Sequence, residues 1–411
     1  MKVKKKLNRD IFREYDIRGD SSLIDDDTAY TIGLGFGSYI KSIGKTTCVV
    51  GHDNRLSGGV LYNALQKGIL ETGIDIISLG LCTTPMYYYA CIKLKVFSEM
   101  ALNKQDINGV YLGKDGYLVE RHEDSKIDVE MLQKSMDRLV QFTEKYANQL
   151  GSEHVKVMLV PTASEILTEK LPAFASGFDQ NGMIDKIYEQ LPEGTALDVR
   201  ETLKEHADES IYYKTDHHWT ARGAYLAANA FLNAAEGEEL PTIDKYESGV
   251  RENFLGSLYK AVMTEKAGSI LENHPDKVEY FYPFADATVT AYSSAKMENG
   301  ENRDILYPDY SETSNLYCIF MGGDIALGKL ETETKNGKSI LVVRDSYGHA
   351  IIPFLIDAYE TIYTVEPRYF NEANKLELGK FFFRKRHLKS LYTLIAHLLR
   401  RALPCFSAHS L

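Results

Sequence analysis

The sequence predicts an α/β protein made of two unrelated units, each a three-layer α/β/α arrangement. Within residues 1–96, a β-rich run at 46–50 is followed by a polar turn, a helical pattern and a second strand at 74–79. This order is that of a βαβ unit, in which parallel strands are covered by helices. From residue 111 onward, strand and helix patterns alternate again, which indicates a second α/β unit.

The first unit also contains a glycine run that has two interpretations. Gly33, Gly35 and Gly37 alternate with other residues, as in part of a dinucleotide-binding loop. Such a loop follows a strand and requires a third glycine at a different spacing, and neither condition is met here. The run therefore favours close packing of one helix against another.

The second unit begins with a hairpin over 111–119, whose turn contains Asp115 and Gly116. An amphipathic helix follows over 128–150, and a buried strand over 155–160 ends at Pro161. Further along the chain, the patterns predict helices at 183–191, 199–207 and 221–234 and strands at 195–199, 316–321, 339–343 and 361–365.

The composition excludes some classes of function. The 411 residues carry a net charge of −11, whereas a nucleic-acid-binding protein needs a basic face for the phosphates. Five cysteines lack the paired spacing of a metal site, so we expect ordinary thiols. The basic start of the chain is followed by acidic residues, and no apolar run reaches the length of a membrane span. We expect the chain as written to stay in the cytoplasm.

The end of the chain has a different composition. From Leu378 to Leu411 there are no acidic residues, and leucines at helical spacing predict a basic amphipathic helix over 388–403. Such a helix can lie on an anionic membrane. The alternative is a tail without an evolved role, either helical or disordered.

One candidate for chemistry is the segment Asp216-His217-His218-Trp219. Thr220 is a plausible N-cap, which places the segment in the loop before a helix. Residues two apart in an extended loop point the same way, so the Asp216 carboxylate can orient the His218 imidazole. His217 is expected to face elsewhere. Two other interpretations stay open: that these residues bind a metal, and that they only cap the helix.

The second candidate is Ser346, which follows a predicted strand of four apolar residues and opens a helix. Open α/β sheets bind their ligands at the carboxyl ends of such strands. The N–H groups of Tyr347 and Gly348 are candidates for an oxyanion hole, and Gly323 in the Gly322-Gly323-Asp324 turn is a third. Together with the Asp-x-His motif elsewhere in the chain, Ser346 would complete a catalytic triad, in which the serine is the nucleophile, the histidine is the base and the aspartate orients the histidine. The alternatives are that Ser346 is only a helix N-cap and that Gly322-Gly323-Asp324 is only a turn.

Residues 107–370 resemble the DHHW family, which is related to the alginate O-acetylation proteins and has an SGNH-hydrolase-like fold. The resemblance is carried by these segments: 108–118, Val160-Pro161-Thr162, 215–223, 254–259 and Arg344-Asp345-Ser346-Tyr347. It implies that Ser346 is the nucleophile, His218 the base and Asp216 its orienter, acting on acetyl esters of extracellular polysaccharide. It also implies a membrane-bound O-acyltransferase as a partner that supplies acetyl groups.

The sequence departs from this pattern in places. Proteins of this kind normally carry a membrane anchor or export signal, which would make the parent domain extracellular or membrane-anchored. An asparagine is usual where Asp324 stands, and a carboxylate accepts hydrogen bonds rather than donating them. The β-rich end that normally follows Arg368-Tyr369 is replaced by the basic tail.

Residues 10–96 resemble the start of an α-D-phosphohexomutase, of the phosphomannomutase/phosphoglucomutase family. The segments that carry the resemblance are 12–19, 51–58 and 80–85. It implies that Tyr15 and Arg18 lie near a sugar-phosphate site. The phosphoserine loop expected after Ala90 is absent. After Val96 the sequence resembles the DHHW family instead, so the Mg²⁺-binding loop of a phosphohexomutase is missing as well. We therefore expect no mutase activity, no cofactor and no metal.

These observations predict a division into a truncated phosphohexomutase domain I (1–96), a junction (97–110), an SGNH/DHHW-like domain (111–372) and a basic tail (373–411). The leading hypothesis is an O-acetyltransferase or acetylesterase fused to an inactive mutase fragment. The alternatives are a non-functional chimaera and a chain that retains only sugar-phosphate binding through Tyr15 and Arg18.

Overall fold

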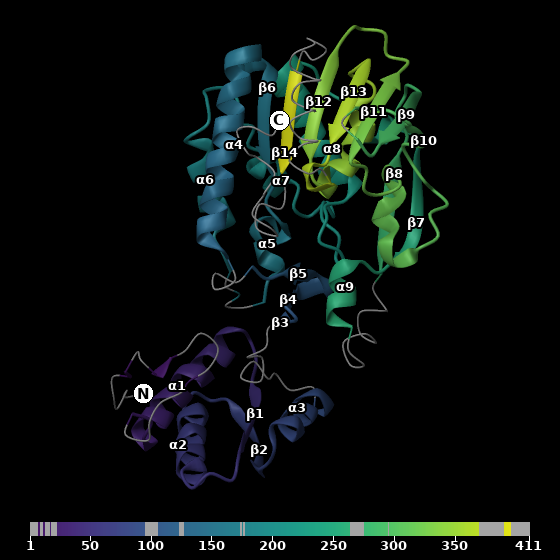
Figure 1. The fold of residues 1–411 in the computed structure, drawn as a ribbon. Helices are drawn as coiled ribbons and strands as arrows, with labels where there is room; N and C mark the ends of the chain where they lie inside the picture. Colours follow the sequence, from purple (N-terminus) through teal and green to yellow (C-terminus); the bar gives the residue numbers. More distant parts are fainter. Residues whose placement is uncertain are drawn as a thin grey trace. The chain divides into compact units, whose positions relative to one another are not determined.

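The computed structural model describes residues 7–8, 11–12, 17, 23–94, 106–122, 127–172, 175, 177–263, 275–294, 296–369 and 390–395. The chain divides into two compact units, residues 1–105 and 106–411. Both are α/β, and each is described separately (Figure 1). No described helix combines the length and the apolar character needed to cross a bilayer.

The first unit is built on two parallel strands, β1 (Thr47–His52) and β2 (Asp75–Leu81), joined by the helix α2 (Gly58–Leu70). Two further helices are α1 (Asp26–Ser42), which is capped by the Asp25 side chain, and α3 (Thr84–Lys93). Cys48 and Val50, two residues apart on β1, share a buried cluster with residues of α1 and α2. The predicted βαβ unit is therefore confirmed.

The glycines of α1 serve helix packing. A Cβ at Gly33 would lie 2.3 Å from the carbonyl oxygen of Leu65 on α2, and a Cβ at Gly68 would lie 2.2 Å from the carbonyl oxygen of Tyr30. Real Cβ atoms do not approach other atoms so closely, so only glycine permits this approach of the two helices. The packing interpretation is confirmed for Gly33 and for Gly37, where a Cβ would lie 3.1 Å from the carbonyl oxygen of Ile69, but not for Gly35, where a Cβ would meet no atom within 4 Å.

The second unit contains a sheet of seven strands in the order β10-β9-β11-β13-β12-β14-β6. The strands β13, β12, β14 and β6 are parallel, and β11, β9 and β10 continue the sheet in antiparallel fashion. Their bounds are β6 (Val155–Leu159), β9 (Ala287–Tyr292), β10 (Glu301–Arg303), β11 (Leu327–Thr332), β12 (Ser339–Arg344), β13 (Thr361–Val365) and β14 (Ser390–Ile395).

Both faces of this sheet are covered, which gives the three layers. Ile340 and Val342 of β12 belong to the core shared with α8 (Ala221–Glu236), whereas Leu341 and Val343 belong to a second core. That second core contains α4 (Val129–Leu150) and α6 (Gln180–Tyr188), which lie alongside each other in Figure 1. Alternate side chains of a strand point to opposite faces, so a run of apolar residues is what a strand between two helical layers needs.

Smaller elements surround the sheet. A three-stranded hairpin sheet is formed by β3 (Asp106–Ile107), β4 (Val110–Leu112) and β5 (Leu118–Glu120), and β7 (Ser248–Phe254) pairs with β8 (Asp276–Phe281). The short helices include α5 (Ala163–Ile166), α7 (Arg200–Glu205), α9 (Ser257–Val262) and α11 (Ile352–Leu355). The 3-10 helices are η3 (Lys114–Gly116), η5 (Ser152–His154), η6 (Thr168–Lys170), η7 (Ile243–Lys245), η8 (Thr313–Ile319), η9 (Ser346–Ala350) and η10 (Pro367–Tyr369).

Three predictions about local structure were wrong. The segment 316–321 is not a strand, because residues 313–319 form the 3-10 helix η8. The segment 195–199 contributes only a bridge between Val157 and Ala196. The predicted helix over 388–403 is contradicted at 390–395, where β14 inserts between β12 and β6. For residues 390–395, strand pairing within the folded unit overrides the local helical pattern.

Candidate active site

The Asp216-His217-His218-Trp219 segment lies in a tight loop that ends where α8 begins. Tyr212 and Trp219 form an antiparallel bridge, and the N–H of Tyr213 donates to the carbonyl oxygen of His218 at 3.2 Å. Thr220 is the N-cap of α8, as predicted. The loop is therefore closed at its base, and its side chains have fixed directions.

A buried carboxylate holds the start of this loop. Asp276 at the beginning of β8 accepts hydrogen bonds from the N–H of Lys214 at 2.9 Å and from the N–H and hydroxyl of Thr215 at 2.7 Å and 2.6 Å. Burial raises the pKa of Asp276, although these hydrogen bonds oppose the rise. The Thr215 hydroxyl accepts in turn from the N–H of Gly256 at 3.1 Å, which ties the loop to the start of α9.

The structure brings Asp216, His218 and Ser346 into one chain of hydrogen bonds. The Nδ1 atom of His218 lies 2.6 Å from Oδ1 of Asp216, and its Nε2 atom lies 2.9 Å from Oγ of Ser346. An ionised carboxylate can only accept, so the proton of the neutral imidazole sits on Nδ1. The lone pair of Nε2 then faces the Ser346 hydroxyl, as a general base requires.

Asp216 remains ionised because its surroundings favour the charge. Burial alone would raise its pKa, but the charge and hydrogen bond of His218, the charge of His217 and the N–H of Ser257 together hold the pKa well below its usual range. Its Oδ1 also accepts from the N–H of His218 at 3.0 Å, and its Oδ2 accepts from the N–H of Ser257 at 2.8 Å. These contacts fix the carboxylate as well as its charge.

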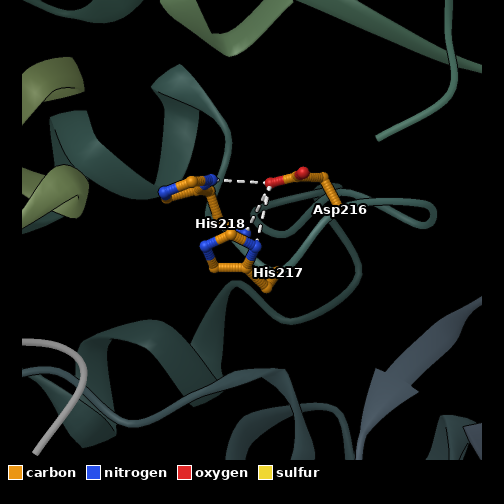
Figure 2. Close-up of side chains that lie close together, drawn as sticks. All are labelled: Asp216, His217 and His218. Atoms are coloured by element: carbon orange, nitrogen blue, oxygen red, sulfur yellow. Dashed lines mark hydrogen bonds and ion pairs between the residues drawn. The ribbon is translucent and has the colours of Figure 1, made fainter. Parts of the chain in front are cut away.

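His217 does not face elsewhere, contrary to the prediction. Its ring centroid lies 3.9 Å from that of His218, and Figure 2 shows both imidazoles beside the Asp216 carboxylate. Its Nδ1 atom lies 2.5 Å from Oγ of Ser257 and 3.8 Å from Oδ1 of Asp216. The chain bends within the loop, so the alternation of an extended segment does not apply.

These three side chains also have ligand atoms within 4.8 Å of one another, which is compact enough for a metal ion. The 2.6 Å separation of His218 Nδ1 and Asp216 Oδ1 is a direct hydrogen bond. An ion bound at about 2.0–2.2 Å from each atom would need them farther apart, so the arrangement fits a proton better than a metal.

Aromatic rings enclose the His218 imidazole. The ring of Tyr317 on η8 stacks on it at a centroid distance of 3.8 Å and an interplanar angle of 5°. The Tyr317 hydroxyl donates to the carbonyl oxygen of Tyr347 at 3.2 Å, and Trp219 Nε1 donates to the same oxygen at 3.0 Å. The Tyr347 hydroxyl donates to the carbonyl oxygen of His217. The loop and η9 are thus locked together. Sequence reasoning missed Tyr317, because its segment was expected to be a strand.

Ser346 stands at the carboxyl end of β12, where it opens η9. Behind it, the buried Arg344 donates through Nε to Thr364 Oγ1 at 2.7 Å and lies 3.9 Å from Glu366. Burial lowers the pKa of Arg344, and the charge of Glu366 opposes this. A Cβ at Gly348 would lie 2.5 Å from the Arg344 side chain, so glycine lets η9 turn over the guanidinium stem.

The three predicted oxyanion donors already have acceptors. The N–H of Tyr347 donates to Oδ1 of Asp345 at 3.0 Å, and that of Gly348 donates to the carbonyl oxygen of Asp345 at 3.2 Å. The N–H of Gly323 donates to the carbonyl oxygen of Phe320 at 3.2 Å. Ser346 is the first residue of η9, and the first N–H of a helix has no acceptor within that helix. Its own N–H is therefore a further candidate donor.

The residues predicted to bind a sugar phosphate, Tyr15 and Arg18, lie outside the described residues. The turn after β1 is described, and a cavity of about 240 Å³ lies beside it. Its lining includes His52 and Asp53 from the end of β1 and Cys82 and Thr83, which follow β2.

The family model described as DHHW protein matches residues 113–365, which is more than half of the chain. The chain belongs to the DHHW family. A second family model, the α/β/α domain I of phosphoglucomutase/phosphomannomutase, matches residues 9–136. The chain thus joins a DHHW domain to a segment similar to phosphohexomutase domain I.

Solved structures agree with this assignment of the DHHW domain. A DHHW family protein from Eubacterium siraeum is 28% identical with a TM-score of 0.57, and the match covers 71% of this chain and 92% of that one. Bacillus cereus PatB1, solved with a sulfonyl adduct, is 18% identical with a TM-score of 0.57 over 72% of this chain and 98% of that one. The second likeness is one of fold.

The curated relatives match the first unit. A phosphoglucomutase of Neisseria gonorrhoeae is 39% identical over 87 residues, which are 21% of this chain and 19% of that enzyme. A phosphomannomutase of Vibrio cholerae is 29% identical over 168 residues, or 36% of each chain. The chain therefore spans about a fifth to a third of the length of these enzymes.

Proposed function

We propose that the DHHW domain is a serine O-acetyltransferase or acetylesterase that acts on acetyl esters of polysaccharides. The observation that carries the proposal is the pair of contacts at His218, with Asp216 at Nδ1 and the Ser346 hydroxyl at Nε2. This is the arrangement in which an imidazole takes the proton of a hydroxyl while a carboxylate stabilises the resulting imidazolium.

The reaction follows from these positions. The Ser346 oxygen attacks the acetyl carbonyl carbon as its proton passes to His218 Nε2, and the carbonyl electrons move onto oxygen. Collapse of this intermediate breaks the ester bond, and His218 returns the proton to the departing hydroxyl. The acetyl group on Ser346 is then taken by water, which gives hydrolysis, or by a sugar hydroxyl, which gives transfer. Water exclusion and the bound acceptor decide between the two outcomes.

The N–H of Ser346 supports stabilisation of the oxyanion in this scheme. Donors that are already oriented toward developing charge contribute about 3–4 kcal/mol each in acyl transfer. The rings of Tyr317 and His217 on either side of His218 add orientation, because they restrict rotation of the imidazole.

The test is hydrolysis of p-nitrophenyl acetate by the full chain and by Ser346→Ala. We expect the variant to lose several orders of magnitude in kcat, since the nucleophile is removed. Ser248→Ala, at an exposed position on β7, is the matched control and should keep the full rate. Equal rates for the full chain and Ser346→Ala would remove the proposal.

Two further measurements sharpen the result. A sulfonyl fluoride should form one adduct, which peptide mass spectrometry should locate at Ser346 and not at Ser257. Incubation with an acetyl donor and an unacetylated oligosaccharide then separates the two activities, because transfer increases the mass of the oligosaccharide and hydrolysis leaves it unchanged.

We also propose that residues 1–105 have no mutase activity. The support is in the sequence, where no Thr-Ala-Ser-His-Asn-Pro phosphoserine loop follows Ala90. The test is glucose 1-phosphate with Mg²⁺ and a coupled assay for glucose 6-phosphate, and turnover above background would overturn it. A rise in the melting temperature with glucose 1-phosphate alone would instead indicate residual binding.

A further inference from the structure

A buried histidine lies on the same short helix as the nucleophile. His349 follows Ser346 by three residues in η9, and residues three apart in a 3-10 helix lie on the same face. The side chain is 2% exposed, and within the described part of the chain its Nε2 atom has no hydrogen-bond partner. An unpartnered buried polar atom is unfavourable, so this one calls for an explanation.

The carboxylate of Asp324 lies close to that atom. Oδ1 of Asp324 lies 3.7 Å from Nε2 of His349, just beyond hydrogen-bond distance, and the Asp324 side chain is 44% exposed. The other carboxylate oxygen accepts from the hydroxyl of Tyr369. Asp324 thus accepts a hydrogen bond from Tyr369, and a small movement would let it accept a second one from His349.

The backbone before Asp324 has an unusual conformation. Met321, Gly322 and Gly323 all have positive φ values, of 61°, 71° and 92°. Three consecutive residues in this region make a sharp turn, which costs conformational energy for the methionine. The turn directs the Asp324 carboxylate toward His349, and hence toward the face of η9 that carries Ser346.

A carboxylate at this place opposes the chemistry proposed above. The intermediate on Ser346 develops a negative charge on oxygen, and a second negative charge beside the same short helix disfavours it, because like charges repel. Hydrogen bonds to a carboxylate disperse its charge and fix its direction. Burial lowers the pKa of His349 well below its usual range, so the imidazole is available as a neutral donor.

We propose that His349 and Tyr369 are positioning residues that fix the Asp324 carboxylate and disperse its charge while the oxyanion forms on Ser346. The proposal rests on the proposed acyl transfer. Donation from His349 Nε2 to Asp324 satisfies the buried donor, and together with the Tyr369 hydroxyl it reduces the negative charge that the oxyanion experiences. Neither residue exchanges a proton with substrate.

The test is a double-mutant cycle that uses p-nitrophenyl acetate and the full chain. His349→Leu removes the donor and should lower kcat about tenfold with little change in KM. Asp324→Asn removes the charge, so it should keep or raise kcat. In the Asp324→Asn background, His349→Leu should then change kcat by less than about twofold, because no charge remains to be held.

Two variants keep the test decisive. His349→Gln retains a donor and should restore most of the rate that His349→Leu loses. Tyr369→Phe removes the other hydrogen bond at a half-exposed residue, where the fold is not at risk, and should show the same dependence on Asp324. If His349→Leu does not fold, the proposal is tested by comparing the effect of Tyr369→Phe on kcat in the parent chain and in Asp324→Asn.

The proposal is overturned if these substitutions reduce kcat equally with Asp324 and with asparagine at that position, or if they leave kcat unchanged. Its failure is distinct from failure of the proposed function. If only the role of His349 and Tyr369 is wrong, the parent chain still hydrolyses the ester and is labelled at Ser346. If the proposed function is wrong, the parent chain does neither.

Discussion

Adding one methyl group at Gly256 should disable the site without replacing any of the three side chains that are proposed to react. A Cβ at this position would lie 2.4 Å from the Cβ of Asp216 and 2.5 Å from its Oδ2. The backbone of Gly256, with φ −81°, is one that alanine adopts freely, so Gly256→Ala acts only through this contact.

The size of the effect follows from the distances. Ordinary contacts of a Cβ begin at 3.4 Å, so Asp216 has to retreat by about 1 Å. This movement breaks the 2.8 Å hydrogen bond from the N–H of Ser257 and carries the hydrogen-bonded His218 with it. A displacement of about 1 Å at a reacting group can reduce the rate about 10²-fold, and we expect a loss of that order in kcat/KM.

The assay is hydrolysis of p-nitrophenyl acetate, with thermal unfolding of the same samples. Gly35→Ala is the matched control, because a Cβ at that helical position would meet no atom within 4 Å, and it should leave the rate unchanged. If Gly256→Ala folds and keeps at least half of the parent rate, the position of Asp216 does not govern catalysis and the reasoning is refuted.

Three other outcomes follow from the same geometry. The pKa of Asp216 is lowered in the folded protein, so its contribution to stability is present above the unfolded-state pKa of about 3.9 and is lost as the pH falls further. The unfolding free energy should therefore decline below about pH 4. This decline should be steeper than in Asp216→Asn, which lacks the titrating carboxyl group. Trp219→Phe removes the hydrogen bond to the buried carbonyl of Tyr347 and should reduce the unfolding free energy by about 1–3 kcal/mol, measured with urea. EDTA should leave ester hydrolysis unchanged, since the His218–Asp216 contact fits a proton; loss of activity that Zn²⁺ restores would instead identify a metal site that includes His217.

Part of this fold could be predicted from the sequence because the signals are long or continuous. The helix α4 carries an apolar stripe over 22 residues with Asp128 as its cap, and β12 is an uninterrupted apolar run between two helical layers. Each of these patterns fits only one type of secondary structure, so the local sequence and the tertiary structure agree.

The antiparallel half of the sheet could not be predicted, because β10 and β11 are short and contain charged residues, and β9 alternates threonine with small or aromatic residues over only six positions. The segment around Tyr317 is apolar over only a few positions, and so short a run does not distinguish a strand from a buried 3-10 helix. Only the folded unit, in which the ring stacks on an imidazole, decides its conformation.

For the candidate site, the sequence indicated which residue types come together but not how. Asp216, His218 and Ser346 were combined from the logic of acid–base chemistry, and the structure places them in one hydrogen-bonded chain. The direction of the His217 ring and the acceptors of the predicted oxyanion donors depend on backbone bends of a single residue. No periodicity carries that information.

The place of β14 in the sheet has a consequence for biosynthesis. The strand that ends beside the proposed nucleophile Ser346 is paired on one side with residues 390–395, which leave the ribosome after every other described strand of the sheet. Until then β6 and β12 cannot be bridged, since neighbouring strands lie only about 4.8 Å apart. A nascent chain would thus carry an open gap beside the incomplete candidate site until residues 390–395 have been synthesised.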